Sequence, residues 1–196
     1  MGYDTVVTAG SRQSPQCEIV SYICEHLKVN CKVFMPFGGD TSVIEHIKEN
    51  KYTEIMRVRP GYNNIIIARA KEYAENRKCG YVPFGMECAE NVKVTSEQVQ
   101  NIPEDCRRVV VPVGSGMSFS SIVTGMNKYE INKPLLGVRV GKDPSKIINE
   151  YAYGLDLMDY EIVTSSVDYH ESVDAWVGDY NLDPIYEACL LYTSDA

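Results

Sequence analysis

The chain has 196 residues, a formal net charge of -8 and a hydrophobic fraction of 44%, so it can bury a core as one large domain or two small ones. The acidic balance argues against a nucleic-acid partner, because binding to a phosphate backbone needs a basic face. No apolar run reaches the roughly 18 residues that cross a bilayer, and no secretory signal is evident. We therefore expect neither a nucleic-acid nor a membrane partner.

The seven cysteines are irregularly spaced and include no Cys-x-x-Cys pair. This pattern fits neither a disulfide framework nor a zinc site. Cys17 and Cys24 fall on one face of an expected helix, which predicts buried thiols and a reducing, cytoplasmic compartment. The three histidines are far apart in sequence, and no metal site is expected.

Short β-rich runs alternate with amphipathic stretches in the first part of the chain. Strands are expected at 4–8, 31–35, 55–58 and 80–84, with helices at 15–27, 43–50 and 63–76. In the first helix, Ile19, Val20, Ile23 and Leu27 recur at helical spacing. Thr41 or Ser42 can cap the second helix.

The alternation continues after a looser segment near residues 83–88. We expect helices at 95–100, 119–128 and 144–151, strands at 107–113, 135–140 and 160–163, and the start of a helix within 183–188. Strands alternating with helices imply parallel β-α-β units. The sequence therefore predicts an α/β fold with doubly wound, mostly parallel sheets in two lobes, at 1–83 and 84–188, with a cleft between them.

The sharpest motif is the run Val109–Ser118, in which an apolar strand enters Gly114-Ser115-Gly116 and then a helix. Such a turn directs backbone N–H groups and a helix N-terminus at one point, which suits a phosphate. Ser115 and Ser118 add hydroxyl groups. The run is neither a P-loop nor the dinucleotide fingerprint, whose third glycine would fall at Phe119. Taken alone, the turn could be only a connection.

A second strand ends in a similar turn at Thr8–Pro15. Ligands of open α/β sheets bind at the carboxyl ends of strands. The side chains of Ser11, Gln13 and Ser14, with the helix N-terminus, could hold a carboxylate there. The alternative is plain helix capping by Ser14, with Pro15 at the first helical position.

Three stretches together resemble the fold-type-II pyridoxal-phosphate enzymes, the tryptophan-synthase-β-like group. Within that group they are most similar to the 1-aminocyclopropane-1-carboxylate deaminase and D-cysteine desulfhydrase family. The family's Gly-Gly-x-Gln-Ser-Asn turn matches Gly10-Ser11-Arg12-Gln13-Ser14-Pro15. Its Val-x-Val-Gly-Ser-Gly-Gly-Thr phosphate cup matches Val111-Pro112-Val113-Gly114-Ser115-Gly116-Met117-Ser118. Its Asp-Pro-Val-Tyr-Glu/Thr segment matches Asp183-Pro184-Ile185-Tyr186-Glu187.

The resemblance implies a role for each matching residue. Pyridoxal 5'-phosphate would be the cofactor, and the activity would be deamination or α,β-elimination of a small amino acid to a 2-oxo acid and ammonia. Ser14 and Tyr186 would be catalytic, and Glu187 would face the pyridine nitrogen. The carboxylate of the substrate would be bound by Ser11, Gln13 and Ser14, in the lobe at 1–83. The cofactor phosphate would be bound by Gly114, Ser115, Gly116, Met117 and Ser118, in the partial cofactor lobe at 84–188.

Three departures from the family pattern bear on activity. Pro15 replaces the asparagine that contacts the cofactor ring, and Met117 replaces a cup glycine and can crowd the phosphate. The family's Schiff-base lysine lies upstream of the first motif, whereas no lysine precedes Lys28 here. Without that lysine the chain is expected to be inactive, and we interpret it as a fragment whose residues 189–196 derive from a sequencing adaptor.

Two other function classes stay open. One is a non-catalytic α/β module that binds a phosphorylated ligand reversibly. The other is a nucleotide-binding enzyme, which needs an acidic residue after the strand that follows the glycine-rich helix, where Asp143 is a weak match. A homodimer is a further possibility, because members of the resembling family tend to dimerise.

Overall fold

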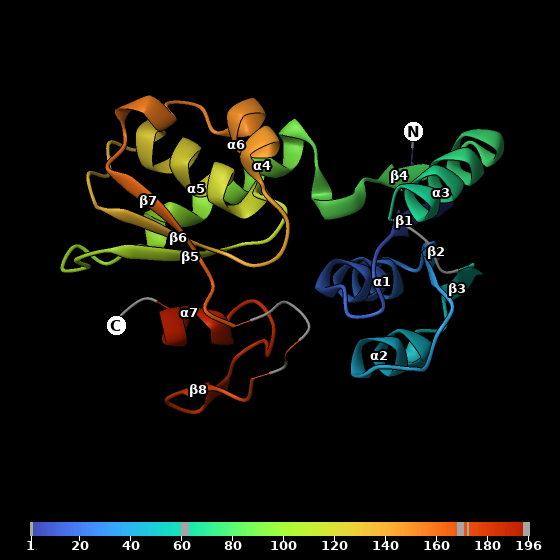
Figure 1. The fold of residues 1–196 in the computed structure, drawn as a ribbon. Coiled ribbons are helices and arrows are strands. Elements are labelled where there is room, and N and C mark those ends of the chain that lie inside the picture. The colour runs from blue at the N-terminus through green and yellow to red at the C-terminus, as the bar shows by residue number, and fades with distance from the viewer. Residues whose placement is uncertain (1, 60–62, 168–170, 172, 194–196) are drawn as a thin grey trace. The chain divides into compact units, whose positions relative to one another are not determined.

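The computed structural model describes residues 2–59, 63–167, 171 and 173–193, and the chain divides into two compact units. Unit 1 spans Met1–Met86 and unit 2 spans Glu87–Ala196 (Figure 1). The sequence predicts the division a few residues earlier, between 83 and 84. Within the described ranges, no helix combines the length and the apolar character that crossing a bilayer requires.

Unit 1 is a four-stranded parallel sheet with helices on both faces (Figure 1). Its strands have the order β3-β2-β1-β4 and comprise β1 (Thr5–Ala9), β2 (Asn30–Pro36), β3 (Thr53–Val58) and β4 (Gly80–Val82). The helices are α1 (Pro15–Leu27), α2 (Ser42–Glu49) and α3 (Asn63–Arg77), and the short η1 (Phe84–Met86) follows β4.

Alternation of side chains along β2 builds the two cores of unit 1. Cys31, Val33 and Met35 pack with α1 and α2 on one face. Phe34 points to the other face, where it packs with Ala70 and the rest of the buried side of α3. The period of two that places these residues is that of a strand covered on both sides.

Helix α1 buries a different face from the one that its large apolar residues suggest. Its buried residues are Cys17, Val20, Ser21 and Cys24. The hydroxyls of Ser21 and Thr53 form a hydrogen bond of 2.8 Å, which gives this polar residue a partner inside the unit. The predicted burial of Cys17 and Cys24 is confirmed, whereas Ile19, Ile23 and Leu27, three of the four residues that predicted the helix, are exposed.

Unit 2 contains a three-stranded parallel sheet of order β5-β6-β7 and a small antiparallel pair. Its strands are β5 (Val109–Val113), β6 (Leu135–Arg139), β7 (Tyr160–Thr164), β8 (Trp176–Val177) and β9 (Tyr180–Asn181). Its helices are α4 (Ala89–Ser96), α5 (Met117–Lys128), α6 (Ser145–Tyr151) and α7 (Ala188–Thr193), with shorter turns η2 (Glu97–Asn101) and η3 (Leu155–Leu157). The core lies between the sheet and α5, around Phe119, Val123 and Leu135.

Two helices of unit 2 begin elsewhere than predicted. The polar helix expected at 95–100 is α4, which begins at Ala89 and ends in η2. The helix expected within 183–188 begins only at Ala188, because the Asp183 carboxylate accepts the N–H groups of Ile185 and Tyr186 and holds a turn ahead of it. Helix α7 includes residues 188–193 with Cys189 buried, while 194–196 lie outside the described residues. The origin of 189–196 in an adaptor stays a prediction.

Candidate functional site

The turn after β5 presents backbone donors at the carboxyl end of the unit 2 sheet. Gly114–Gly116 connect β5 to the first turn of α5. Among the described residues, the N–H groups of Ser118 and Phe119 have no hydrogen-bond acceptor. The side chains of Ser115 and Ser118 are exposed. N–H groups at a helix N-terminus, beside hydroxyls, are groups that can donate to an anion, and binding of the cofactor phosphate here stays a prediction.

Close packing around Gly116 requires glycine at this position. Its φ is +100°, a conformation that other residues rarely adopt. A Cβ added to it would lie 3.2 Å from both Ile148 Cγ1 and Pro144 Cβ. Pro144, just before α6, and Ile148 within α6 thus pack against the turn.

The side chain of Met117 is 2% exposed and belongs to the interior of unit 2. Its N–H lies 3.4 Å from Ser115 Oγ. The side chain of Met117 is buried whereas Ser115 and Ser118 are exposed. The expected crowding of the phosphate by this methionine stays a prediction.

The segment Asp183–Glu187 brings an aromatic ring to the turn. A Cβ added to Gly114 would lie 2.8 Å from Tyr186 Cε1, so this ring lies directly against the glycine. Glu187 Oε2 accepts the N–H of Asp183 at 2.9 Å. The carboxylate of Glu187 therefore stabilises the local turn, and its role beside a pyridine nitrogen stays a prediction.

The turn after β1 belongs to unit 1 and is equally tight. A Cβ on Gly10 would lie 2.4 Å from Cys17 Sγ and 2.7 Å from Ser14 Oγ. The Gln13 N–H lies 3.4 Å from Ser11 Oγ, and the Gln13 side chain is exposed. Ser14 is the N-cap residue of α1, but its hydroxyl makes no capping hydrogen bond. The alternative thus holds for the positions, with Ser14 as N-cap and Pro15 as the first helical residue, but not for a capping hydrogen bond from the hydroxyl.

Cys17 lies beneath this turn as a neutral thiol. Burial raises the pKa of Cys17 to about 12, and a hydrogen bond with Ser14 only partly offsets that effect. A thiol that stays protonated at neutral pH is a poor nucleophile. The predicted catalytic role of the Ser14 hydroxyl stays a prediction.

Strand order identifies the point of unit 1 where a ligand is expected. The chain runs from β1 to β2 on one side and returns to β4 on the other, so the order reverses between β1 and β4. Ligands of open α/β sheets bind outside the carboxyl ends of strands at such a point. Gln16 Nε2 donates to Thr8 Oγ1 at 3.0 Å and to Pro83 O at 2.7 Å, which ties the two strand ends together. The sequence analysis does not single out Gln16. The feature that could have identified it is an amide side chain in the first turn of α1, next to the end of β1.

A hollow of about 250 Å³ in unit 1 lies away from this point. It is lined by residues that include Tyr3, Lys78 and Cys79. These residues precede β1 and β4, so the hollow is at the amino edge of the sheet. Its position argues against a part in chemistry at the carboxyl edge.

Asp143, the acidic residue that the nucleotide-binding alternative needs, has local partners. Its Oδ1 accepts the Ser145 N–H at 3.0 Å and the Ser145 hydroxyl at 2.5 Å. Hydrogen bonds from Ser145 hold the pKa of Asp143 below its usual range. These contacts give the carboxylate a structural role at the start of α6.

Comparisons with known proteins agree with this geometry. No family model matches the chain. A probable 1-aminocyclopropane-1-carboxylate deaminase of Schizosaccharomyces pombe is 23% identical over 168 residues, covering 74% of this chain and 49% of that protein. An ACC deaminase homologue of known structure has a TM-score of 0.79 at 18% identity, covering 97% of this chain and 68% of that one. A pyridoxal 5'-phosphate-dependent aspartate racemase has a TM-score of 0.52 at 17% identity, covering 69% and 40%.

These likenesses define the architecture. The chain has the fold of the fold-type-II pyridoxal-phosphate enzymes, and the predicted α/β fold with parallel sheets is confirmed. In sequence and in fold it is similar to a deaminase in particular. The chain spans about half the length of the curated relative that it matches.

Proposed function

We propose that the chain is part of a pyridoxal-phosphate-dependent lyase or deaminase that releases a 2-oxo acid and ammonia from a small amino acid. The observation that carries the proposal is the glycine turn after β5. There the N–H groups of Ser118 and Phe119 have no acceptor among the described residues, two serine side chains are exposed, and the Tyr186 ring lies against Gly114. Likeness to a deaminase in both sequence and fold supports the reaction class.

The donor set of the turn fits the phosphate of pyridoxal phosphate. The N–H groups of Ser118 and Phe119 and the hydroxyls of Ser115 and Ser118 can each donate to a phosphate oxygen. Gly116 adopts the positive φ of +100° that shapes this turn, a conformation that glycine adopts without a steric penalty. When bound, the cofactor supplies an electron sink for the negative charge that develops on a reacting carbon.

The turn after β1 would hold the substrate. Ser11 and Gln13 can donate to its α-carboxylate, and the N-terminus of α1 favours negative charge there. The Ser14 hydroxyl, which caps no helix, can accept or donate a proton at Oγ. Tyr186 would orient the reacting group through its phenol oxygen. No lysine precedes Lys28, so the amine that such enzymes use is not supplied ahead of this turn, and we expect no turnover by the chain as it stands.

A second candidate function uses the same phosphate site. The turn after β5 would then hold a phosphorylated ligand reversibly, without covalent capture and without chemistry. Both candidates require the phosphate site, and they differ only in whether an amine of the chain bonds to the cofactor aldehyde.

A titration tests the phosphate site. The probe is pyridoxine 5'-phosphate, which lacks an aldehyde and so cannot bond to surface lysines, compared with unphosphorylated pyridoxine. We expect binding that needs the phosphate, weakens in Ser118→Ala and is lost in Gly116→Asp, with Ser42→Ala at the first turn of α2 as a matched control. Equal binding of the two probes, or equal loss in the control, would contradict the proposal.

A trapping experiment separates the two candidates. The chain is incubated with pyridoxal phosphate, reduced with borohydride and mapped by mass spectrometry. One labelled lysine that disappears in Gly116→Asp supports an enzyme. Phosphate-dependent binding without specific labelling supports the reversible module.

A further inference from the structure

The turn after β1 carries a cation that has no acidic partner in the described part of the chain. Arg12 lies between Ser11 and Gln13. The guanidinium donates from Nη1 to the carbonyl oxygen of Gly39 at 2.8 Å. No described carboxylate lies within 4.0 Å of it, whereas Lys48 and Arg57 both pair with Asp40. Of the five N–H donors of an arginine, the contact with Gly39 uses one.

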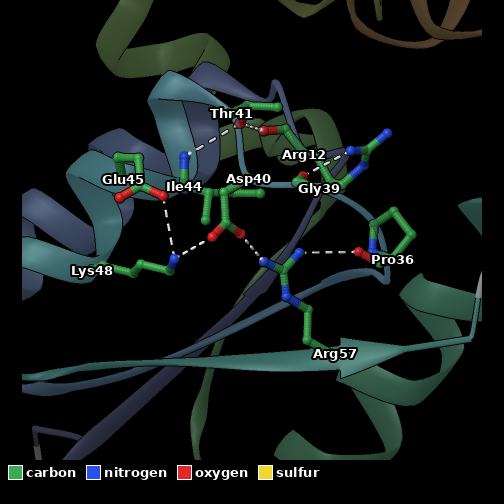
Figure 2. A network of polar contacts seen from close by, with 9 residues as sticks. All are labelled: Arg12, Pro36, Gly39, Asp40, Thr41, Ile44, Glu45, Lys48 and Arg57. Carbon is green, nitrogen blue, oxygen red and sulfur yellow. Dashed lines mark hydrogen bonds and ion pairs between the residues drawn. The ribbon is translucent and has the colours of Figure 1, made fainter.

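The connection between β2 and α2 fixes this arginine at both ends. Thr41 Oγ1 donates to the Arg12 carbonyl oxygen at 2.5 Å, and the same oxygen of Thr41 accepts the Ile44 N–H at the start of α2. A Cβ on Gly38 would lie 2.7 Å from Arg12 Cζ, so the guanidinium packs directly on that glycine. Figure 2 shows the backbone and the side chain of Arg12 held by the same short loop. The Arg12 side chain is therefore already ordered, so binding of a ligand would cost little of its conformational entropy.

The nearby acid, Asp40, forms ion pairs with two other cations. Its Oδ1 accepts Arg57 Nη2 at 2.8 Å, and its Oδ2 accepts Lys48. The hydrogen bond from Lys48 lowers the pKa of Asp40, so this carboxylate stays ionised and paired. In Figure 2 the Arg12 guanidinium turns toward Gly39 and away from Asp40. Among the described residues, no carboxylate therefore neutralises the positive charge of Arg12.

We propose that Arg12 determines substrate specificity by binding a second acidic group, so that the substrate is an amino acid with an acidic side chain. The inference rests on the proposed function, in which Ser11, Gln13 and Ser14 hold the α-carboxylate. Parallel strands β1 and β2 end at the same edge of the sheet, so the loop that holds Arg12 borders the turn on the side opposite β4, and the second acidic group would lie on that β2 side. A guanidinium matches a carboxylate with two parallel hydrogen bonds, which a neutral side chain of a substrate cannot accept in the same way.

Binding to the isotopically labelled chain tests this assignment without turnover. The probes are DL-aspartate and DL-alanine, followed through the amide signals of Ser11 and Gln13 and the Arg12 Nε–H signal. We expect aspartate to bind about tenfold more tightly than alanine, the order of a charge-assisted hydrogen bond. Arg12→Met should remove this preference and leave the affinity for alanine unchanged, while Arg69→Met, an exposed arginine on α3, should preserve it.

Two results would overturn the assignment, and they differ in what else they contradict. Equal affinity for the two amino acids, with signals of Ser11 and Gln13 shifting in both titrations, contradicts the role of Arg12 and supports the carboxylate turn. No shift of these signals with either amino acid contradicts both the role of Arg12 and the proposed substrate turn. Unchanged signals elsewhere in unit 1 of Arg12→Met show that the variant folds.

Discussion

The contact between Gly114 and Tyr186 predicts that a side chain at residue 114 lowers the unfolding free energy, and that the loss depends on the tyrosine ring. A Cβ at residue 114 would lie 2.8 Å from Tyr186 Cε1, well inside ordinary contact distance, so the ring must move when Gly114 is replaced by alanine. Overpacking of this kind costs about 1–3 kcal/mol. For a chain of this size, each kcal/mol lowers Tm by roughly 2–4 °C. We expect Gly114→Ala to lower the unfolding free energy by that amount.

A double-mutant cycle isolates the cause. Leucine has no Cε1 atom, so in a Tyr186→Leu background the same Gly114→Ala change should cost less than about 0.5 kcal/mol, the margin within which independent sites add. The single tryptophan, Trp176, lies in unit 2, and its fluorescence during urea unfolding reports on that unit. An equal cost of Gly114→Ala in both backgrounds would refute the placement of Tyr186 against the turn.

Three further predictions follow from other residues. Gly116→Ala should lose about 1–3 kcal/mol of unfolding free energy because φ is +100° there, whereas Gly39→Ala, whose Cβ would have no atom within 4 Å, should lose none; equal urea midpoints would contradict this. The hydrogen bond from Lys48 lowers the pKa of Asp40, so the ionised carboxylate contributes fully to stability above a pH of about 3.9, and this contribution disappears as the pH falls through the lower pKa of the folded state. Asp40→Asn should therefore flatten the dependence of the unfolding free energy on pH in that acid range, and an unchanged dependence would count against the pairing. Because burial raises the pKa of Cys17 to about 12, iodoacetamide at pH 8 should label Cys17 only after unfolding but should label the partly exposed Cys106 in the native chain, as peptide mapping would show.

The sequence predicts the order of elements well because each strand and helix has its own local signal. Alternation of apolar runs and amphipathic stretches places every strand of the two parallel sheets close to its observed bounds. The helix at 15–27 is predicted with the bounds that the structure has. The sequence does not predict which face of this helix is buried, because free cysteines and Ser21 occupy the interior while Ile19 and Ile23 are exposed.

The sequence indicates which residues form the two candidate turns, but it does not predict the contacts that these residues make. Glycines and serines in the turns at 10–15 and 114–118 are visible as motifs. The bond from Arg12 to Gly39 joins residues 27 positions apart, and it depends on β1 and β2 being neighbours in the sheet. The ring of Tyr186 reaches Gly114 only because the turn at Asp183 directs the chain back toward β5. Such contacts come from topology, which a single sequence specifies only through the whole fold.

The most direct test of the central claim follows the backbone of the turn after β5. Amide signals of Ser118 and Phe119, whose N–H groups have no acceptor among the described residues, are recorded by NMR during addition of pyridoxine 5'-phosphate and, separately, of pyridoxine. A phosphate accepting these groups should shift both signals downfield with the phosphorylated probe only. Signals that stay in place, or that move equally with the unphosphorylated probe, would contradict a phosphate site at this turn.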